Sequence, residues 1–235
     1  MKLAILGYGK MGKNIERIAQ DKGHDIVYIA NQNPDEEQLR NAEVAIEFSV
    51  PEAAFQNISL CLKNRVPVVS GTTGWLKHFE EAKSLAMSNQ SKFLYASNFS
   101  VGVNIFFKLN SILAKMMRTH SSYKVEMDEI HHTEKKDAPS GTAITLAEQI
   151  IEQTDYTSWS HPVTNEEKSI PIEAYREKGI FGTHVINYKS AIDTISIKHE
   201  AHSREGFAMG AVIAAEWLVE QDKSGTFSMD DVLKL

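Results

Sequence analysis

The sequence is poor in the features that mark several protein classes. Its single cysteine among 235 residues, Cys61, can form neither an internal disulfide nor a thiolate metal cluster, and its apolar neighbours predict a small buried side chain. No apolar run approaches the roughly 18 to 20 residues that a membrane-spanning helix needs. The opening MKLAILGYG lacks the succession of charged segment, apolar stretch and cleavage site that makes up a signal peptide. We therefore expect a cytoplasmic protein without a membrane partner.

An excess of positive charge is also missing. The chain has 25 Lys and Arg against 31 Asp and Glu, which gives a net charge of −6. The composition therefore does not require a basic surface that could bind a nucleic acid. Small molecules are the expected ligands. Repeats, low-complexity tracts and Pro/Gly/Ser linkers are absent as well, so any domain boundary has to be inferred from a change of pattern. With 42% hydrophobic residues, the chain can bury the core of one large or two modest domains.

In the first hundred residues, short apolar runs alternate with helical stretches. Between the first two runs, Ile15, Ile18 and Ala19 share one face of a helix expected over Lys13–Asp21, and Gly23 is its stop signal. This alternation predicts a parallel sheet. We expect five strands, each buried on both faces, at Leu3–Leu6, Ile26–Ala30, Val44–Phe48, Pro67–Ser70 and Phe93–Ala96.

The pattern changes near residue 100. A helix is expected over Asn104–Arg118, with an apolar stripe formed by Ile105, Leu109, Ile112, Leu113 and Met116. Four strand-like segments follow, and the close spacing of the last three predicts an antiparallel meander; they are Val125–Ile130, Ile170–Tyr175, His184–Lys189 and Thr194–His199. Two helices end the chain: Phe207–Glu220, expected to cover the first sheet, and Met229–Leu233, with Ser228 as its cap.

The predicted fold class is therefore α/β. It combines an N-terminal Rossmann-type doubly wound parallel sheet with an α+β domain whose mixed sheet is largely antiparallel. The returning C-terminal helices place residues 1–100 and 205–235 in the first domain and residues 101–204 in the second.

A glycine motif joins the first expected strand to the first helix. In this context Gly7 permits a tight turn, Gly9 lets a pyrophosphate approach the backbone, and Gly12 lets helix and strand pack closely. The motif predicts dinucleotide binding, whereas on a purely structural interpretation the three glycines only make a tight turn.

The second expected strand ends in Asn31, where NAD-binding proteins usually carry an acidic residue. An asparagine can still bind a ribose hydroxyl, and it does not repel the 2′-phosphate of NADP, which Lys10 or Lys13 could pair with. A solvated helix face explains both lysines equally well. We therefore expect NADH or NADPH as the cofactor, with the preference open.

Two further turns follow expected strands of the same sheet, Gly71–Gly74 and Ala96–Phe99, and Glu47–Ser49 ends another. The carboxyl ends of parallel strands meet at one edge, which is where such sheets bind ligands. Each segment alone is an ordinary turn. Together with the glycine motif, they predict one cofactor crevice.

The segment Glu129–Thr142 concentrates reactive side chains between a strand and a helix. Ser140 is the expected helix cap, and the free N–H groups of the first turn at Gly141 and Thr142 suit a carboxylate. His131, His132 and Lys135 precede them, and histidine and lysine can move protons or neutralise an anion.

Two other interpretations of the histidine pair compete with catalysis. A metal site is disfavoured, because neighbours on a strand point to opposite faces and no cysteine or HExxH helix completes a ligand set. A structural pair, partly buried and without chemistry, stays open. In a second polar cluster, His199–Glu205, Arg204 could reach a carboxylate or tie the returning segment to the first domain, and we favour the structural role.

These motifs, in this order, resemble the dihydrodipicolinate reductase family. The HHxxKxDAPSGT run is the specific one, and the full set is Gly7–Gly12, Gly71–Gly74, Asn98–Asn104, Glu129–Thr142 and Gly225–Leu233. The resemblance implies a two-domain, usually tetrameric enzyme. It moves hydride from NADH or NADPH to a cyclic, unsaturated dicarboxylate and yields tetrahydrodipicolinate. The second domain then serves substrate binding and oligomerisation.

Residue roles follow from the resemblance. His131 matches the family's proton donor or acceptor and Lys135 its proton donor, while His132, Gly141 and Thr142 match residues that bind the substrate's carboxylates. No metal is implied. Asn31 departs from the acidic residue of many relatives. The expected cofactor-binding set is Gly7, Tyr8, Gly9, Lys10, Met11, Gly12, Asn31, Gly71, Thr72, Thr73, Ala96, Ser97, Asn98 and Phe99.

Two rival functions remain at this point. A nucleotide-sensing regulator would need a basic or aromatic recognition face, and none stands out in the sequence. A different reductase of the same architecture, such as an amino-acid or sugar-acid dehydrogenase, fits the first domain equally well but not the histidine–lysine loop. Turnover of the cyclic substrate separates all three possibilities.

Overall fold

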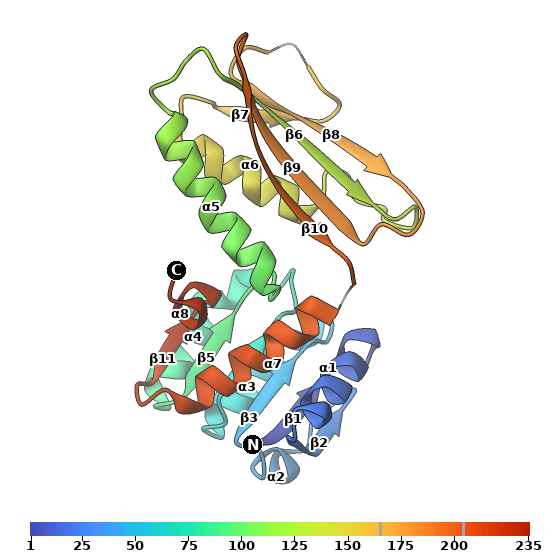
Figure 1. Ribbon diagram of the computed structural model, residues 1–235. Coiled ribbons are helices and arrows are strands. Elements are labelled where there is room, and N and C mark those ends of the chain that lie inside the picture. Colours follow the sequence, from blue (N-terminus) through green and yellow to red (C-terminus); the bar gives the residue numbers. More distant parts are fainter. Residues whose placement is uncertain (165, 204) are drawn as a thin grey trace. The chain divides into compact units, whose positions relative to one another are not determined.

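The computed structural model of the chain describes residues 1–164, 166–203 and 205–235. They form two compact units, Met1–Asn104 with Glu205–Leu235, and Ile105–Arg204 (Figure 1). The boundary falls inside helix α5 (Val101–Met117). Arg204, to which the sequence assigns a structural role, lies outside the described residues.

The first unit is built on a six-stranded sheet in the order β11-β5-β4-β3-β1-β2, and every pair in it is parallel. The predicted parallel sheet is confirmed. One strand, β11, was not predicted, because three residues are too few to show a period. The strands are β1 (Lys2–Leu6), β2 (Asp25–Ala30), β3 (Val44–Glu47), β4 (Val68–Ser70), β5 (Lys92–Tyr95) and β11 (Gly225–Phe227).

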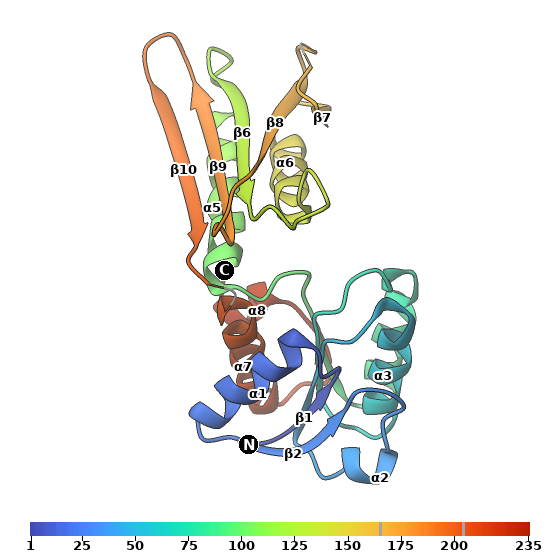
Figure 2. The same cartoon turned by 90° about the vertical axis from the view of Figure 1, so that its right-hand side faces the viewer.

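Helices cover both faces of this sheet (Figure 2). One face is covered by α1 (Lys10–Asp21) and α7 (Glu205–Glu220), the other by α3 (Pro51–Lys63) and α4 (Phe79–Ser88). This arrangement is the predicted doubly wound fold. The shorter helices are α2 (Glu36–Leu39), the 3-10 helix η1 (Leu76–His78) and α8 (Met229–Leu233).

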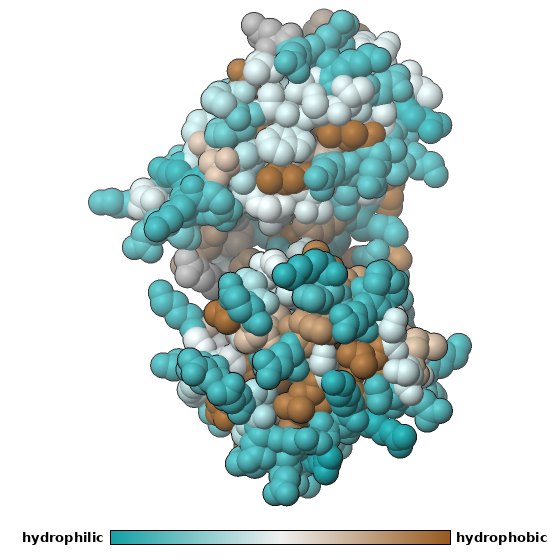
Figure 3. All heavy atoms as spheres, turned by 180° about the vertical axis from the view of Figure 1, so that it is seen from behind, coloured by the Kyte–Doolittle hydropathy of each residue, from teal (hydrophilic) through white to brown (hydrophobic). Residues whose placement is uncertain are grey.

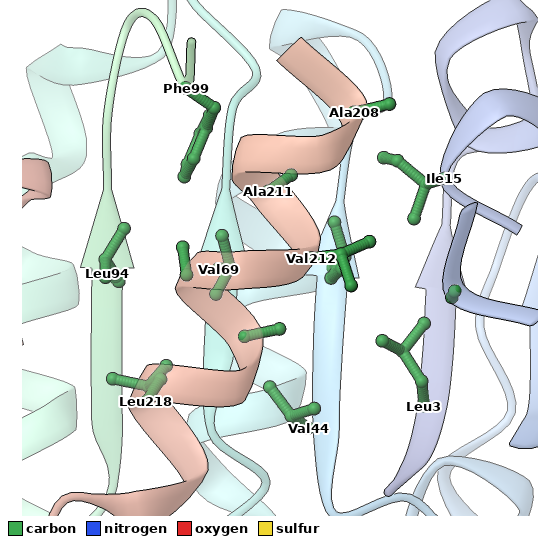
Figure 4. Close-up of a cluster of buried hydrophobic side chains, with 14 of the residues drawn as sticks. Leu3, Ile15, Val44, Val69, Leu94, Phe99, Ala208, Ala211, Val212 and Leu218 are labelled. Atoms are coloured by element: carbon green, nitrogen blue, oxygen red, sulfur yellow. The ribbon is translucent and has the colours of Figure 1, made fainter. Parts of the chain in front are cut away.

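Helix α7 is the returning helix that the sequence predicts. Its residues Ala211, Val212 and Leu218 are fully buried in one core with Val44 and Val69 of the sheet (Figure 4). Small side chains let the helix lie close to the strands, so the C-terminal segment completes the core of the N-terminal unit.

Strand β2 corrects one expectation. We expected burial on both faces, but Val27 and Ile29 are each 36% exposed, because β2 lies at the edge of the sheet beyond β1. An edge strand has a neighbour on one side only, and its inward-facing side chains, such as Ala30, carry the packing.

The second unit is built on a five-stranded mixed sheet in the order β10-β9-β6-β8-β7. The mixed sheet is confirmed, but the predicted meander is wrong, because β6 lies between β8 and β9. It pairs parallel with β8 and antiparallel with β9, and spacing along the chain does not reveal such an insertion. The strands are β6 (Lys124–His131), β7 (Ser158–Ser160), β8 (Ser169–Arg176), β9 (Gly182–Lys189) and β10 (Thr194–Ala201).

Helices α5 and α6 (Gly141–Gln153) cover one face of the second sheet (Figure 2). The expected apolar stripe of α5 is not the buried one, since Leu109 and Ile112 are 51% and 48% exposed. The helix has a second apolar face, and its Phe106 and Ala114 enter the core instead. Both faces satisfy a helical period, so periodicity alone could not choose between them.

No helix of the described residues is long and apolar enough to cross a membrane. On the face shown in Figure 3, hydrophobic side chains form separate groups among hydrophilic ones.

Candidate active site

The glycine motif forms a tight turn between β1 and α1. Gly7 has φ +95°, and a Cβ there would lie 2.1 Å from the carbonyl oxygen of Phe48. A Cβ on Gly12 would lie 2.2 Å from the carbonyl oxygen of Gly7, whereas one on Gly9 would meet no described atom within 4 Å. Packing therefore requires Gly7 and Gly12. Gly9 instead leaves an open approach to the backbone.

A cavity of 430 Å³ lies against this turn, at the carboxyl ends of β1, β2 and β3. Gly7, Tyr8 and Gly9 line it together with Asn31, whose Oδ1 accepts a 3.3 Å hydrogen bond from the Tyr8 N–H. The structure thus brings the glycine turn and the end of the second strand to one place. Of the remaining residues in this motif, Lys10 is exposed and Met11 packs against the core.

The fully buried carboxylate of Glu47 joins the ends of β3 and β4. Its Oε2 accepts a 2.7 Å hydrogen bond from Ser70, and its Oε1 accepts 3.0 Å bonds from the Thr72 hydroxyl and the Ser49 N–H. The Thr72 hydroxyl is therefore committed within the protein. The side chain of Thr73 is exposed, so its hydroxyl is open to a ligand.

Aromatic packing holds the turns after β4 and β5. The ring of Phe48 lies so close to Gly71 that a Cβ there would approach its Cζ to 2.1 Å, and its centroid is 5.6 Å from that of Phe99. Phe99 is 2% exposed, and Asn98 Oδ1 accepts a 2.9 Å bond from the Ser100 N–H. The Phe99 side chain is thus part of the core. Ala96 also packs against this core, while Ser97 is exposed.

In the second unit, the alternation of β6 places polar side chains at the end of an apolar row. Val125 and Met127 face the helices, and with a period of two Glu129 and His131 follow on the same face. Strand pairing sets His184 of β9 opposite Glu129 and Arg176 of β8 opposite His131. Glu129, His131 and His184 are at most 8% exposed.

Glu129 is the centre of a hydrogen-bonded cluster. Its Oε1 accepts a 3.0 Å bond from Arg176, and its Oε2 accepts a 3.0 Å bond from the Ser140 N–H and lies 3.3 Å from His131 Nδ1. Burial opposes ionisation of this carboxyl, but the contacts with His131, Ser140 and Arg176 outweigh it and lower its pKa to about 2. The carboxylate is therefore charged at neutral pH.

His184 completes the cluster in its neutral form. Its Nε2 lies 3.1 Å from the hydroxyl of Ser140, and burial, followed by the charge of His131, lowers its pKa to about 3. Sequence reasoning missed His184 and Arg176 as site residues. The alternation of β9, where His184, Ile186 and Tyr188 are all buried, carries the signal that could have identified the first.

The reactive segment links β6 to α6 as predicted. Ser140 is the cap of α6, because its hydroxyl accepts a 3.2 Å bond from the Ala143 N–H. Gly141 is exposed and Thr142 half-buried at the first turn. The Lys135 ammonium lies 2.8 Å from Asp137, and this contact lowers the pKa of the Asp137 carboxyl.

The two adjacent histidines have different surroundings. His131 ends β6 on the helix-covered face, whereas His132 lines a cavity of 240 Å³ with Lys178 and Phe181. A ligand in that cavity would meet the His132 side chain and the Lys178 ammonium.

Glu129, His131 and His184 also offer ligand atoms within 4.8 Å of one another, as a metal site would. The donor set nevertheless fits hydrogen bonding better. Arg176 occupies one oxygen of the carboxylate, and Ser140 contacts both its other oxygen and the imidazole of His184. The positive charge of the Arg176 guanidinium, whose nitrogen lies 3.0 Å from the carboxylate, would repel a metal cation bound there.

Comparison with known proteins covers both units. Residues 1–99 match the family model "Dihydrodipicolinate reductase, N-terminus", and residues 102–233 match "Dihydrodipicolinate reductase, C-terminus". A 4-hydroxy-tetrahydrodipicolinate reductase of Christiangramia forsetii is 51% identical over 99% of this chain and 98% of its own length. One from Archaeoglobus fulgidus is 32% identical over the whole of both chains.

A solved structure shares the fold. The dipicolinate-bound dihydrodipicolinate reductase of Paenisporosarcina sp. TG-14 superposes with a TM-score of 0.81 over 97% of either chain, at 24% identity.

Proposed function

This chain belongs to the dihydrodipicolinate reductase family, and on that premise we propose which of its residues perform the reaction. It is an oxidoreductase that reduces the dehydrated cyclic dicarboxylate derived from 4-hydroxy-tetrahydrodipicolinate to tetrahydrodipicolinate. The step serves lysine and diaminopimelate biosynthesis. Family membership rejects the rival regulator and the rival amino-acid or sugar-acid dehydrogenase.

The first unit holds the nicotinamide cofactor, which supplies a hydride when bound. The 430 Å³ cavity and the open side of Gly9 support a pyrophosphate site at the N-terminus of α1. Asn31, which lines the same cavity, binds a ribose hydroxyl. The segments Gly71–Thr73 and Ala96–Phe99 complete the crevice. They contribute chiefly backbone groups and exposed side chains, because Thr72 and Phe99 are buried.

The second unit binds and protonates the substrate. Hydride addition to a carbon conjugated with carboxylates builds negative charge, which the Lys135 ammonium and the N-terminus of α6 stabilise. Lys135 donates the proton, with His131 as proton donor or acceptor beside it. His132, Gly141 and Thr142 bind the carboxylates. The observation that carries this proposal is that an imidazole, an ammonium and a capped helix N-terminus lie within one short segment of the chain.

Lys135→Ala tests the proposal. We expect turnover to fall at least ~100-fold, the effect of losing a general acid, with the affinity for NADH or NADPH nearly unchanged. The matched control is Lys136→Ala, which removes an exposed ammonium from the next position and should keep turnover. The assay follows reduced nicotinamide absorbance with freshly prepared cyclic substrate. If nucleotide affinity in Lys135→Ala fell by the same factor as turnover, the lysine would serve cofactor binding or the fold instead.

Either reduced nicotinamide nucleotide serves as the cofactor. Asn31 brings no negative charge that would repel a 2′-phosphate. Lys10 and Lys13, which could pair with that phosphate, are exposed in the first turn of α1. Parallel titrations with NADH and NADPH measure the preference. A difference in Kd above ~1000-fold in either direction would reject dual use.

The enzyme works as a homotetramer, and residues 101–204 provide its oligomerisation surface as well as the substrate site. Exposed apolar side chains in this unit support an interface, among them Leu109 and Ile112 of α5 and Ile195 of β10. Sedimentation equilibrium of the enzyme at assay concentration measures the state. A monomer there would contradict the proposal.

A further inference from the structure

The two oxygens of Glu129 serve different parts of the reactive segment. Oε2 accepts a 3.0 Å hydrogen bond from the Ser140 N–H and lies 3.3 Å from Nδ1 of His131. Oε1 accepts a 3.0 Å bond from the Arg176 guanidinium. One fully buried carboxylate thus lies between an imidazole and a guanidinium.

The contact with His131 determines which ring nitrogen carries a proton. Nδ1 is buried and makes no hydrogen bond within the described part of the chain, and the acceptor oxygen Oε2 of the ionised Glu129 lies 3.3 Å from it. A proton on Nδ1 is therefore favoured, which leaves Nε2 to exchange a proton with a ligand. At Nε2 the neighbour is Gly182, where a Cβ would lie only 3.1 Å away.

The contact with Arg176 reaches the lysine. The same guanidinium donates a 3.3 Å bond to the carbonyl oxygen of Lys135 and a 2.6 Å bond to that of Asp137. These two residues also form the ion pair that holds the Lys135 ammonium. Arg176 therefore holds the backbone from which the ammonium extends, and Glu129 orients Arg176 and balances its charge.

We propose that Glu129 is the positioning residue of this site: it orients the imidazole of His131 through Oε2, and through Oε1 and Arg176 it holds the loop that carries Lys135. This inference rests on the roles proposed above for His131 and Lys135.

Glu129→Gln is the first test, with Glu126→Gln as the matched control on the same strand. Glu126 lies on the opposite face of β6 and pairs with Lys189. In Glu129→Gln we expect kcat to fall at least about tenfold, with KM and nucleotide Kd within about threefold of the natural chain. Glu129→Asp should recover part of kcat, because it restores the charge at a shorter reach. Unchanged kcat in Glu129→Gln, or an equal fall in Glu126→Gln, would overturn the proposal.

Combined variants separate positioning from a general loss of structure. If Glu129 acts through His131 and Lys135, then Glu129→Gln lowers kcat less in a His131→Ala or Lys135→Ala background than in the natural chain. Equal factors in all backgrounds would overturn the inference. The positioning inference and the proposed function can fail separately. Full turnover in both His131→Ala and Lys135→Ala would reject the catalytic roles. Loss of turnover in these two variants, together with full turnover in Glu129→Gln, would reject only the positioning.

A measurement on the unaltered enzyme does not require Glu129→Gln to fold. The ¹⁵N chemical shifts of the neutral His131 ring, assigned by their disappearance in His131→Gln, report which nitrogen holds the proton. We expect the Nδ1–H tautomer. An Nε2–H tautomer would overturn the proposal even if Glu129→Gln does not fold.

Discussion

The hydroxyl of Thr72 donates a 3.0 Å hydrogen bond to Glu47, whose carboxylate is fully buried at the end of the neighbouring strand. The same oxygen of Glu47 accepts a bond from the Ser49 N–H, and the other accepts one from Ser70. The Glu47 carboxylate thus ties the ends of β3 and β4 to the Gly71–Thr73 turn.

Glu47→Gln should loosen this edge of the cofactor crevice. The amide loses one acceptor among several buried donors, so we expect the free energy of unfolding to fall by ~1–3 kcal/mol and the affinity for NADH to weaken. Urea denaturation and fluorescence titration measure the two effects. Glu220→Gln, at an exposed position of α7, should change the free energy by less than ~0.5 kcal/mol. Full stability of Glu47→Gln would mean that the carboxylate does not hold the turn.

The glycine turn separates packing from ligand binding. Gly12→Ala places a Cβ 2.2 Å from the carbonyl oxygen of Gly7, so we expect a large loss of stability. Gly9→Ala meets no described atom within 4 Å, so the melting temperature should stay close to that of the natural chain while nucleotide affinity falls. Calorimetry and nucleotide titration distinguish the two. Unaltered nucleotide binding by Gly9→Ala would mean that the pyrophosphate does not bind at this turn.

Acid should destabilise the protein through His184. Burial, followed by the charge of His131, lowers its pKa from 6.5 to about 3. Between these values the unfolded chain holds a proton that the folded chain lacks, so the free energy of unfolding falls as pH decreases, by up to ~1.4 kcal/mol per pH unit. Glu129, with a pKa lowered from 4.5 to about 2, adds a loss of the same sign only below pH 4.5.

We therefore expect His184→Gln to flatten the decline in stability between pH 6.5 and pH 4.5. Urea midpoints across this range measure it, and His120→Gln, at an exposed position, is the control. An unchanged slope in His184→Gln would show that this residue is not the buried neutral group.

Cys61 should be inert in the folded protein. The side chain is fully buried in the core, and burial, with a smaller effect of the Glu47 carboxylate, raises the pKa of its thiol. An aromatic disulfide reagent should therefore release no chromophore from the native enzyme and one equivalent after denaturation. Rapid reaction of the native enzyme would contradict the burial.

The elements that sequence reasoning predicted best have local signals. The glycine turn, the Ser140 cap and the buried face of α1 each depend on residues only a few positions apart, and the structure confirms them. Strand β11 escaped prediction because three residues show no period, and the packed face of α5 because two faces of that helix are apolar.

The candidate site divides in the same way. His131, His132 and Lys135 stand out within one segment of the chain, as do the residues of the glycine motif. Arg176 and His184 do not, because they reach Glu129 only through strand pairing, across 47 positions of sequence in the case of Arg176.

By itself, therefore, the sequence determined the parallel-sheet unit, the turn beside its cofactor cavity and the reactive segment, since backbone period, capping and turn chemistry act over short spans. Only the tertiary structure decided that β6 lies between β8 and β9. That placement brings Glu129 between Arg176 and His184, because these two residues lie on the strands that pair with β6, and the guanidinium then joins the Ser140 N–H as a donor to the buried carboxylate.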